Sequence, residues 1–482
     1  MTKQEAAIKY ITENYLDYRR LRHDIVADKL QVRCAHSLED ASLQNAPEGL
    51  QFRGSEYWRE MTKHDINSIV CHCAQEYDAN ITSREVMTAL QSDLIPDVHP
   101  LREYVLSCGE WTEEQPDWID WVAQQVTVKT SPESATDRCE APVDRHFVAV
   151  DGRSAAPVVF HNESTASNAS ELQCSASETN YSEATHSSQS ERSEADRLWR
   201  VCFKKWFVAM VASWMKDEVV NHQVLVLIGK QGIFKTTWLE HLIPPHLRAY
   251  ACKLANSNDL NKDERLRIAE FGLISLDEID SMNNRELNQL KSVITATDVN
   301  ERAAYAYTKE RRVRLASFCA SGNRRDFLTD ITGNRRWLPF EVESIQNPFY
   351  TILPYERMYA QAWALAQDPL FSYWFDLDEI EVLEEHNQHF RDESNEEQLL
   401  PILFDVPAEG KGEFMTTAQI SERLVTYGNI KKPMALSRLG MVLGAAGYQS
   451  TRPKIGGRLI RGWLVYQRDT DEIASLKRLL KE

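Results

Sequence analysis

Residues 229–237 have the composition and the setting of a phosphate-binding loop. They read Gly-Lys-Gln-Gly-Ile-Phe-Lys-Thr-Thr, after the apolar run 223–228 and before a helical pattern that begins at Trp238. In a strand–loop–helix unit, backbone N–H groups and the positive end of the helix surround a phosphate group. We therefore expect ATP to bind here. The candidate residues are Gly229, Lys230, Gln231, Gly232, Ile233, Phe234, Lys235, Thr236 and Thr237.

Two side chains of this loop are suited to nucleotide chemistry. The Lys235 ammonium would reach the β- and γ-phosphates, and the Thr236 hydroxyl would ligate Mg²⁺. The loop departs from the usual G-x-x-x-x-G-K-[ST] pattern because Phe234 stands where a glycine precedes the lysine. The Phe234 N–H can still donate to a phosphate if its side chain points away. The departure therefore bears on the rate of hydrolysis more than on nucleotide binding.

A second apolar strand, residues 271–276, ends in the carboxylates Asp277 and Glu278. Nucleotide hydrolysis needs one carboxylate in the Mg²⁺ shell and another that orients or deprotonates the attacking water. Asp277 suits the first role and Glu278 the second. An apolar run that ends in two acids is otherwise only a strand that reaches a solvated loop. Its position after the phosphate loop favours the catalytic interpretation.

A third strand, residues 313–322, leads to Asn323, where a strand-end amide is placed to hold the attacking water. Further on, Arg335 and Arg336 form a basic pair. An arginine that reaches the γ-phosphate bound by a neighbouring subunit stabilises the charge of the transition state. Ordinary surface ion pairing is the alternative for these two arginines.

The order of these motifs resembles the virulence-associated protein E family, ATPases of phages and mobile elements that look related to superfamily 3 helicases. The resemblance spans roughly residues 195–400 and is carried by residues 229–237, 273–280, 321–323 and 327–337. It implies an AAA+-like ATPase core, a homo-oligomeric ring, and a role in replicating or maintaining mobile DNA. It also implies the roles given above for the catalytic candidates, and makes Arg335 or Arg336 an arginine finger.

Two segments have the composition of DNA-binding surfaces. Residues 302–336 hold nine basic against three acidic residues, and the stretch 298–314 suits a hairpin in which tyrosines stack on bases and cations contact the backbone. Residues 416–466 read as two helices and a glycine-tipped hairpin, the order of a winged helix. The candidate DNA contacts are Arg302, Tyr305, Tyr307 and Lys309 in the first segment and Arg438, Lys454, Arg458 and Arg461 in the second. A solvated edge hairpin and a protein-binding winged helix are the alternatives.

These elements predict an α/β P-loop NTPase core of the AAA+-like type over residues 195–345, with a helical, acidic extension over 346–410. A mostly helical N-terminal domain of unknown role, without a primase motif, would occupy residues 1–130. A serine-rich, acidic segment that cannot bury enough apolar area to fold would link it to the core over 131–194. A winged-helix-like domain would occupy residues 411–482.

The net charge of −17 opposes DNA binding only as an average over the chain. Residues 1–194 carry a net charge of −16 and residues 344–410 of −12, whereas residues 195–343 carry +4 and residues 411–482 carry +7. Local basic fields attract nucleic acid whatever the total charge is. Single-stranded or forked DNA therefore remains the expected partner.

The nine scattered cysteines lack a disulfide-like framework. Cys71 and Cys73, with His64 and His72 nearby, suggest zinc only weakly because a second Cys or His pair is missing, so reduced thiols are the preferred interpretation. No apolar run approaches the roughly 18 residues that cross a bilayer, and the first residues lack a signal-peptide core. We expect a cytoplasmic protein without a membrane partner.

Two functions stay open. The first is an ATP-driven DNA helicase or translocase. The second is an ATP-binding switch or DNA-binding regulator with slow turnover, which Phe234 in the loop would explain. A nuclease or integrase would need a carboxylate cluster or a catalytic tyrosine context, and neither is apparent in the sequence.

Overall fold

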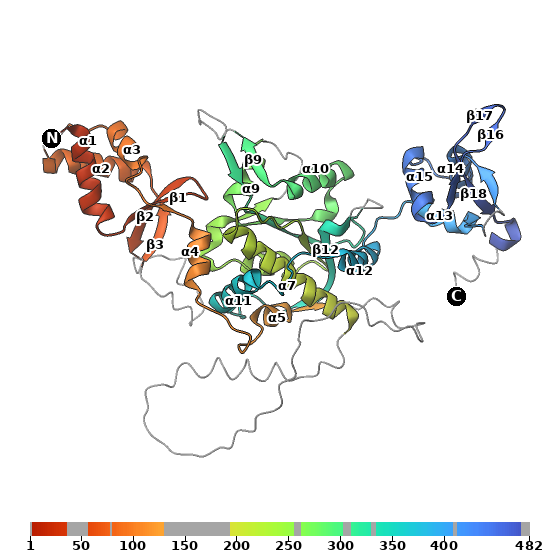
Figure 1. Ribbon diagram of the computed structural model, residues 1–482, viewed down its shortest axis with the longest axis horizontal. Helices are drawn as coiled ribbons and strands as arrows, with labels where there is room; N and C mark the ends of the chain where they lie inside the picture. Colours follow the sequence, from red (N-terminus) through yellow and green to blue (C-terminus); the bar gives the residue numbers. More distant parts are fainter. Residues whose placement is uncertain are drawn as a thin grey trace, which may run out of the picture. The chain divides into compact units, whose positions relative to one another are not determined.

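The computed structural model describes residues 2–35, 56–77, 80–129, 193–254, 262–301, 310–328, 334–407 and 412–473. The chain divides into two compact units. Their helices and strands are labelled in Figure 1. The first comprises Met1–Asn323 and Leu338–Glu381, and the second Arg324–Trp337 and Val382–Glu482. The segment predicted as a disordered linker lies, except for its last two residues, outside the described ranges.

A six-stranded sheet in the order β5-β12-β6-β11-β8-β7 forms the centre of the first unit. Strands β6, β11, β8 and β7 run parallel, and β5 runs antiparallel to β12. β11 thus lies between the strand before the phosphate loop and the acidic strand, although it comes after both in the sequence. The strands are β5 (Val126–Val128), β6 (Val224–Ile228), β7 (Ala251–Leu254), β8 (Leu273–Leu276), β11 (Ser317–Gly322) and β12 (Trp337–Ile345).

The parallel strands are apolar because both faces of the sheet are covered. Every residue of β6, β8 and β11 is buried. Near-continuous runs of Val, Leu and Ile are typical of parallel strands that lie between two layers of helices. The apolar runs predicted as strands are confirmed as β6, β8 and β11. The third strand begins later than predicted, at Ser317, because Val313 is the last residue of the preceding strand β10 (Glu310–Val313).

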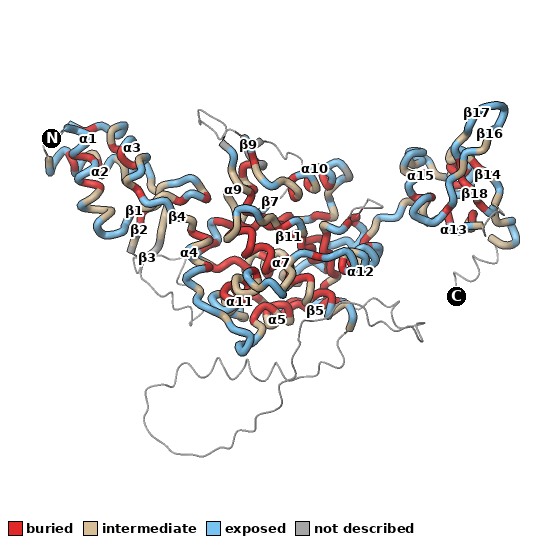
Figure 2. Tube along the Cα trace, in the orientation of Figure 1, coloured by how far each residue is buried: buried red, intermediate tan, exposed pale blue. Residues whose placement is uncertain are grey.

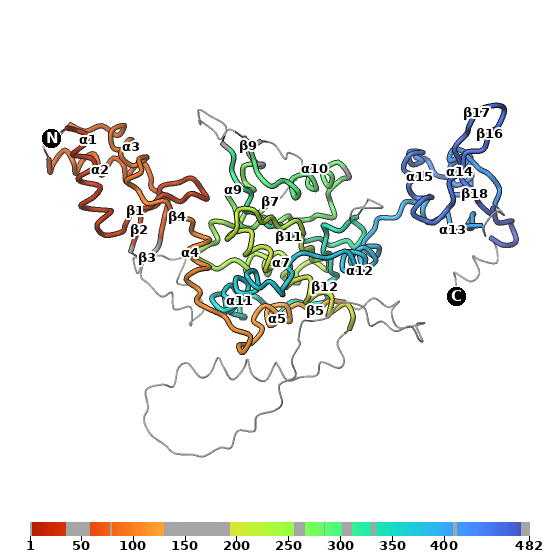
Figure 3. The backbone as a smooth tube through the Cα atoms, in the orientation of Figure 1, coloured from red at the N-terminus to blue at the C-terminus, as the bar shows by residue number. Residues whose placement is uncertain are grey.

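Helix α7 (Glu194–Met215) packs against β6 and against α11 (Tyr355–Gln367), which is distant in the sequence (Figure 3). It is buried along most of its length, as the red tube in Figure 2 shows. Trp199, Trp206 and Trp214 are fully buried, and each indole N–H donates to a backbone carbonyl. Each ring therefore fills volume while its one donor is satisfied. No described helix, α7 included, is long and apolar enough to span a membrane.

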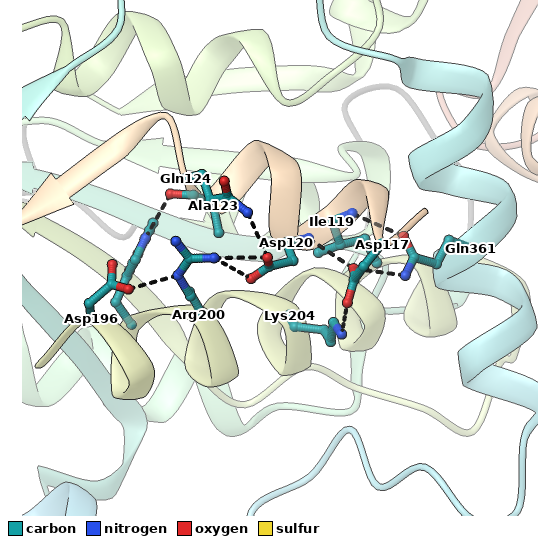
Figure 4. A network of polar contacts seen from close by, with 10 residues as sticks. Asp117, Ile119, Asp120, Ala123, Gln124, Asp196, Arg200, Lys204 and Gln361 are labelled. Carbon is teal, nitrogen blue, oxygen red and sulfur yellow. Dashed lines mark hydrogen bonds and ion pairs between the residues drawn. The ribbon is translucent and has the colours of Figure 1, made fainter. Parts of the chain in front are cut away.

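A polar network joins α7 to α5 (Trp118–Ala123) and to α11 (Figure 4). The Arg200 guanidinium of α7 pairs with Asp120 at 2.8 Å. Gln361 of α11 donates to Asp117 at 2.9 Å, and Asp117 also pairs with Lys204 of α7. These contacts place α5 in the core.

The predicted boundary at residue 130 therefore differs from the observed one. Helix α4 (Pro100–Ser107) and α5 contact α7 and α11, and β5 extends the central sheet. Residues 100–128 belong to the core because Trp118, Ile119 and Val122 bury their side chains there. The composition of this segment did not distinguish it from the residues before it.

The residues before α4 build a core of their own, in which helices α1 (Lys3–Ile11), α2 (Lys63–Tyr77) and α3 (Ser83–Leu90) take part. They also form a sheet in the order β3-β2-β1-β4. The prediction of a mostly helical domain missed this sheet. Its strands are short and carry charges, and Asp28, not glycine, takes the positive φ of 55° in the β1–β2 turn. The strands are β1 (Leu21–Asp24), β2 (Lys29–Ala35), β3 (Glu56–Glu60) and β4 (Asp97–Val98).

The predicted basic hairpin is confirmed at its base. β9 (Asp298–Glu301) and β10 (Glu310–Val313) pair antiparallel after α10 (Asn284–Thr295) and near α9 (Lys262–Glu270). The connecting residues 302–309 lie outside the described ranges. The four candidate DNA contacts among them, Arg302, Tyr305, Tyr307 and Lys309, therefore stay predictions.

Arg314, directly after β10, fixes the hairpin to the core. Its guanidinium is fully buried and donates to the backbone carbonyls of Asn221 at 2.8 Å and Ala316 at 3.0 Å, and to that of Ile294. Burial lowers the pKa of Arg314 to about 9. The hairpin therefore extends from a firmly held base.

The second unit contains the arginine pair in η5 (Asn334–Arg336), the last part of α12 (Leu377–Gln388) and α13 (Asn395–Leu403). Beyond them, helices α14 (Thr417–Gly428) and α15 (Leu436–Ala445) share a hydrophobic core with a sheet. In that sheet β18 (Gly462–Gln467) pairs with β13 (Phe404–Asp405), β14 (Glu413–Met415) and β15 (Gln449–Thr451).

The predicted glycine-tipped hairpin is confirmed as β16 (Lys454–Ile455) and β17 (Arg458–Leu459). Gly456 and Gly457 have φ angles of 55° and 84°. A two-residue hairpin turn with positive φ at both positions favours glycine strongly, since other residues are strained there. Helix α14 begins with a side-chain cap, because the Thr416 hydroxyl accepts the N–H of Gln419.

Candidate active site

The carboxyl ends of β6, β11 and β8 meet at one edge of the central sheet, because the three strands are parallel neighbours. The loop 229–234 follows β6 and leads into α8 (Lys235–His241), the two acids follow β8, and Asn323 follows β11. The Gly229 N–H donates to the Gly322 carbonyl at 3.1 Å, which joins the first and the last of these ends. Residues far apart in the sequence are therefore brought together.

The loop contains two residues with left-handed backbone conformation. Gly232 has a φ of 86° and Phe234 a φ of 66°. A non-glycine residue in this region costs about 1 kcal/mol because Cβ approaches the backbone. Phe234 thus takes a backbone conformation that suits the glycine it replaces, and its ring packs edge-on with that of Phe349 at a centroid distance of 6.4 Å.

Lys235 lies inside the loop, with 7% of its surface exposed. Its ammonium donates to the carbonyls of Gly229 and Lys230, each at 2.7 Å, and to the Asn323 side-chain oxygen at 3.3 Å. Burial lowers the pKa of Lys235, while Asp280 and Asp277 oppose this shift. An ammonium that is held by loop carbonyls can exchange these acceptors for phosphate oxygens.

Asp277 accepts hydrogen bonds from two hydroxyl groups. The Ser321 hydroxyl donates to its Oδ1 at 2.8 Å, and the Thr236 hydroxyl lies 3.3 Å from the same oxygen and 2.9 Å from the Ser321 Oγ. Burial raises the pKa of Asp277, but the hydrogen bonds from Lys253 and Ser321 outweigh it, so the pKa is lowered. The predicted pair Thr236 and Asp277 is therefore in contact.

The other oxygen of Asp277 is paired with Lys253 of β7, whose Nζ lies 2.9 Å away. The hydrogen bond to Asp277 raises the pKa of Lys253, and Glu240 and Glu278 contribute in the same direction. Lys253 therefore places a second cation, in addition to Lys235, beside the Asp277 carboxylate.

Glu278 is exposed and has a φ of 52°, a left-handed conformation at the start of η4 (Ile279–Ser281). Asp280 in the same turn accepts the Asn323 backbone N–H at 3.3 Å. Backbone strain of this kind is frequent where a side chain must be presented for function. The turn holds the acidic strand end and the end of β11 together.

The residues present fit Mg²⁺. Hydroxyl and carboxylate oxygens are its preferred ligands, and it commonly keeps waters and phosphate oxygens in place of further protein ligands. Among the residues that the structure describes, no three or more His, Cys, Asp or Glu side chains are grouped to hold a metal ion.

On α2, Cys71 is exposed and Cys73 is buried, so the two thiols do not share an environment.

Arg335 and Arg336 lie in the second unit. Arg335 is exposed and Arg336 is half-buried, and burial lowers the pKa of Arg336. The buried Asn387 of α12 donates to the carbonyls on either side of the pair, those of Asn334 at 2.9 Å and Trp337 at 3.1 Å. The backbone of the arginine pair is thus firmly held while Arg335 projects into solvent.

The four candidate DNA contacts of the second unit are described as well. Arg438 on α15 is half-buried, and Lys454, Arg458 and Arg461 are exposed on or near the β16–β17 hairpin. The Arg461 Nε donates to the Ser450 hydroxyl at 3.4 Å. Three cations are therefore available at this hairpin for contact with an anion.

The roles of Ser321, Asp280 and Lys253 were missed from the sequence. Ser321 and Asp280 lie within motifs that carried the resemblance, so their place at strand ends was a usable signal. The sequence around Lys253 contained no such signal. Lys253 reaches Asp277 only because β7 pairs in parallel with β8.

Residues 179–397 match the family model of the virulence-associated protein E-like domain. The resemblance stated from the motifs is thereby confirmed for this part of the chain. No curated protein matches the chain.

Solved structures of the NrS-1 C-terminal region match the chain over most of its length. The apo structure of its residues 305–718 is 10% identical to this chain. The match covers 96% of this chain and 99% of the NrS-1 chain, with a TM-score of 0.38. An A form apo structure of the same region is also 10% identical and covers 96% of this chain and 100% of that chain, with a TM-score of 0.35. TM-scores of this size do not establish a common fold.

Proposed function

We propose that this chain, which carries a virulence-associated protein E-like domain, is an ATP-dependent DNA helicase or translocase. It would act in the replication or maintenance of phage or mobile-element DNA. The core would be a P-loop ATPase of the AAA+-like type that assembles into a ring, and residues 411–482 would be a winged-helix-like domain that contacts DNA.

One observation carries this proposal: three strand ends deliver a complementary set of groups to one place. Lys235 contacts Asn323, and Thr236 contacts both Ser321 and Asp277. A cation in contact with an amide, and a hydroxyl in contact with an acid, lie beside one strand–loop–helix unit. These groups match the needs of phosphoryl transfer, which depends on positioning and on charge stabilisation.

The residues divide the work as follows. The loop N–H groups and Lys235 would bind the phosphates. Thr236 and Asp277 would hold Mg²⁺, which would neutralise charge on the phosphate oxygens. Glu278 accepts the proton of the attacking water, and the Asn323 amide keeps that water oriented. Arg335 or Arg336 of a neighbouring subunit stabilises charge in the transition state.

DNA would be moved by the hairpin between β9 and β10. Arg302 and Lys309 would contact the phosphate backbone, and Tyr305 and Tyr307 would stack on bases. The buried Arg314 supports this role, because a firmly held base can transmit a displacement of the core to the hairpin.

Unwinding of a forked DNA by the full chain tests the proposal. We expect ATP-dependent strand displacement that Glu278→Gln abolishes while ATP binding is retained. Glu343→Gln, which changes an exposed carboxylate of β12, serves as the matched control and should leave unwinding unchanged. A mass measurement in ATP should show a ring, and a monomer under all conditions would contradict the arginine-finger role.

A second candidate function is an ATP-binding switch or regulator with slow turnover. The left-handed Phe234 supports it, because a bulky residue at the last loop position replaces the glycine usual in rapid ATPases. ATP-dependent assembly on DNA without measurable unwinding would favour the switch over the helicase.

A further inference from the structure

We propose that Phe349 and Tyr350 form the surface on which the base of the bound nucleotide stacks. The two residues follow β12, outside every motif that predicted the nucleotide site. The inference rests on the proposed function, since it takes the nucleotide phosphates to lie at residues 229–237.

Phe349 lies along the flank of α8. Its ring contacts that of Phe234 at a centroid distance of 6.4 Å and that of His241 at 5.5 Å, both in edge-to-face geometry. Phe234 directly precedes Lys235, and His241 is the last residue of the helix. Phe349 therefore contacts the residue before α8 and the last residue of that helix, and it extends from the loop 229–234 along α8.

The segment that carries the aromatic residues is held in place at both ends. The Asn347 side-chain oxygen accepts the Phe349 N–H at 3.0 Å, and the Asn347 carbonyl accepts the Tyr350 N–H at 3.1 Å. Beyond the turn, the Tyr355 hydroxyl donates to the His241 carbonyl at 2.7 Å. The turn is thus anchored on the same helix that follows the phosphate loop.

The aromatic side chains nevertheless remain open to solvent. Phe349 is 57% exposed, Tyr350 is 85% exposed and the neighbouring Ile352 is 54% exposed. Large apolar side chains that gather on a surface commonly mark a binding site. Their continuity with the phosphate loop through Phe234 identifies the occupant as the base of that nucleotide.

Stacking on a ring face needs no hydrogen-bond partner, so this surface should favour bases with a large π-system over small ones. It also gives Phe234 a role. The ring that departs from the glycine pattern supports Phe349 and thereby contributes to the base site.

Calorimetric titration of the full chain with ATP and with inorganic tripolyphosphate, both with Mg²⁺, tests the inference. We expect Phe349→Ala and Tyr350→Ala each to weaken ATP binding roughly tenfold and to leave tripolyphosphate binding unchanged. Tyr350→Phe, which keeps the ring, should bind ATP as the unchanged chain does. Tyr18→Ala removes another exposed tyrosine, 62% exposed in the N-terminal core, and should have no effect.

Lys235→Ala separates failure of the inference from failure of the proposed function, because it should weaken both ligands. If it does, and the two aromatic variants bind ATP normally, the base surface is rejected while the phosphate site stands. Equal loss of ATP and tripolyphosphate in the aromatic variants would also reject it, since the loop itself would then be disturbed. If Lys235→Ala changes neither ligand, the proposed function fails. Binding of a DNA strand or another subunit that is lost in the aromatic variants, with normal ATP affinity, would assign the surface to that partner instead.

Discussion

At the Asp277 carboxylate, one oxygen accepts from the Thr236 and Ser321 hydroxyls and the other pairs with the Lys253 ammonium. A divalent cation that binds Asp277 must therefore compete with Lys253 for the second oxygen. The ion pair is partly exposed, so its own contribution to stability is small. The ion pair acts electrostatically, because Lys253 neutralises the carboxylate that we propose as a Mg²⁺ ligand.

We predict that Lys253→Met tightens divalent-cation binding in the absence of nucleotide by roughly fivefold, since removing one nearby cation is worth about 1 kcal/mol at a half-exposed site. Mn²⁺ binding followed by electron paramagnetic resonance measures this directly. Lys29→Met, which removes a lysine paired with Glu60 at 2.7 Å in the N-terminal sheet, is the control. Equal Mn²⁺ affinity in all three chains would show that Lys253 does not compete.

The left-handed conformation of Phe234 gives a second prediction at the scale of one residue. Phe234→Gly and Phe234→Ala both remove the ring, but only alanine keeps the strain of a φ of 66°. We expect the glycine variant to be more stable by about 0.5–1 kcal/mol, the reverse of the usual order in regular structure. Thermal unfolding compares the two, and a higher midpoint for the alanine variant would contradict the strain.

Single residues were predictable where a motif fixed their setting. Lys235, Thr236, Asp277 and Asn323 were named from the order of strands and loops, and the structure brings them into contact. Lys253 and Phe349 were not, because no pattern in the sequence reports which strand lies beside β8 or which turn packs on α8.

At the scale of elements, α4 begins with an unusual cap. The Nδ1 of His99 accepts the Arg102 N–H at 3.3 Å, so this nitrogen carries no proton and the imidazole is neutral. Burial lowers the pKa of His99 to about 4, and Arg102 shifts it in the same direction. A histidine whose pKa is depressed on folding binds more protons in the unfolded state at intermediate pH. Its contribution to stability is therefore complete above the ordinary pKa of about 6.5 and is lost as the pH falls toward 4.

We predict that the unfolding free energy falls between pH 7 and pH 5, and that His99 accounts for about 1–2 kcal/mol of the loss. His99→Asn keeps a side-chain acceptor for the Arg102 N–H but does not titrate in this range. Unfolding curves at both pH values should therefore show a smaller loss in the variant. An identical pH dependence in the two chains would show that protonation of His99 does not lower the unfolding free energy.

The elements were predictable in proportion to their apolar content. β6, β8 and β11 are uninterrupted apolar runs because they lie in the middle of a covered parallel sheet. β1, β2 and β5 are short or alternate with charged residues, and β5 needs β12, more than 200 residues later, to complete its pairing. Long-range pairing of that kind leaves no local signal.

At the scale of the first unit, buried polar contacts tie the N-terminal sheet to the residues around the central sheet. The Tyr250 hydroxyl donates to the buried Asp24 carboxylate at 2.6 Å and accepts from Gln31 at 3.3 Å. Arg312 at the base of the hairpin pairs with Asp28 at 2.8 Å. Tyr250 directly precedes β7, the strand that carries Lys253, so the N-terminal sheet contacts both the hairpin and the strand beside the acidic edge.

We predict that Tyr250→Phe loosens the N-terminal sheet from the core, because the buried Asp24 carboxylate loses its shortest hydrogen bond, at a cost of about 1–3 kcal/mol. Limited proteolysis should cut the chain before residue 100 faster than in the unchanged protein. Tyr77→Phe removes a hydroxyl that donates to the exposed Glu13 and is the matched control. Unchanged cleavage in Tyr250→Phe would mean that this contact does not hold the sheet.

The segmental charge was the most useful whole-chain signal, since it separated the acidic residues from the two basic blocks of the core and the C-terminal part. It did not show that residues 100–128 belong to the core, because burial of Trp118 and Ile119 depends on helices distant in the sequence.

In the proposed function, the site at the edge formed by β6, β11 and β8 hydrolyses ATP for work on DNA. Steady-state ATP hydrolysis by the full chain, with and without single-stranded DNA, measures it most directly. We predict hydrolysis that DNA stimulates and that Lys235→Ala reduces by at least about a hundredfold, since the ammonium stabilises the phosphoryl group in the transition state. DNA-stimulated hydrolysis that persists in Lys235→Ala would contradict the assignment of the site.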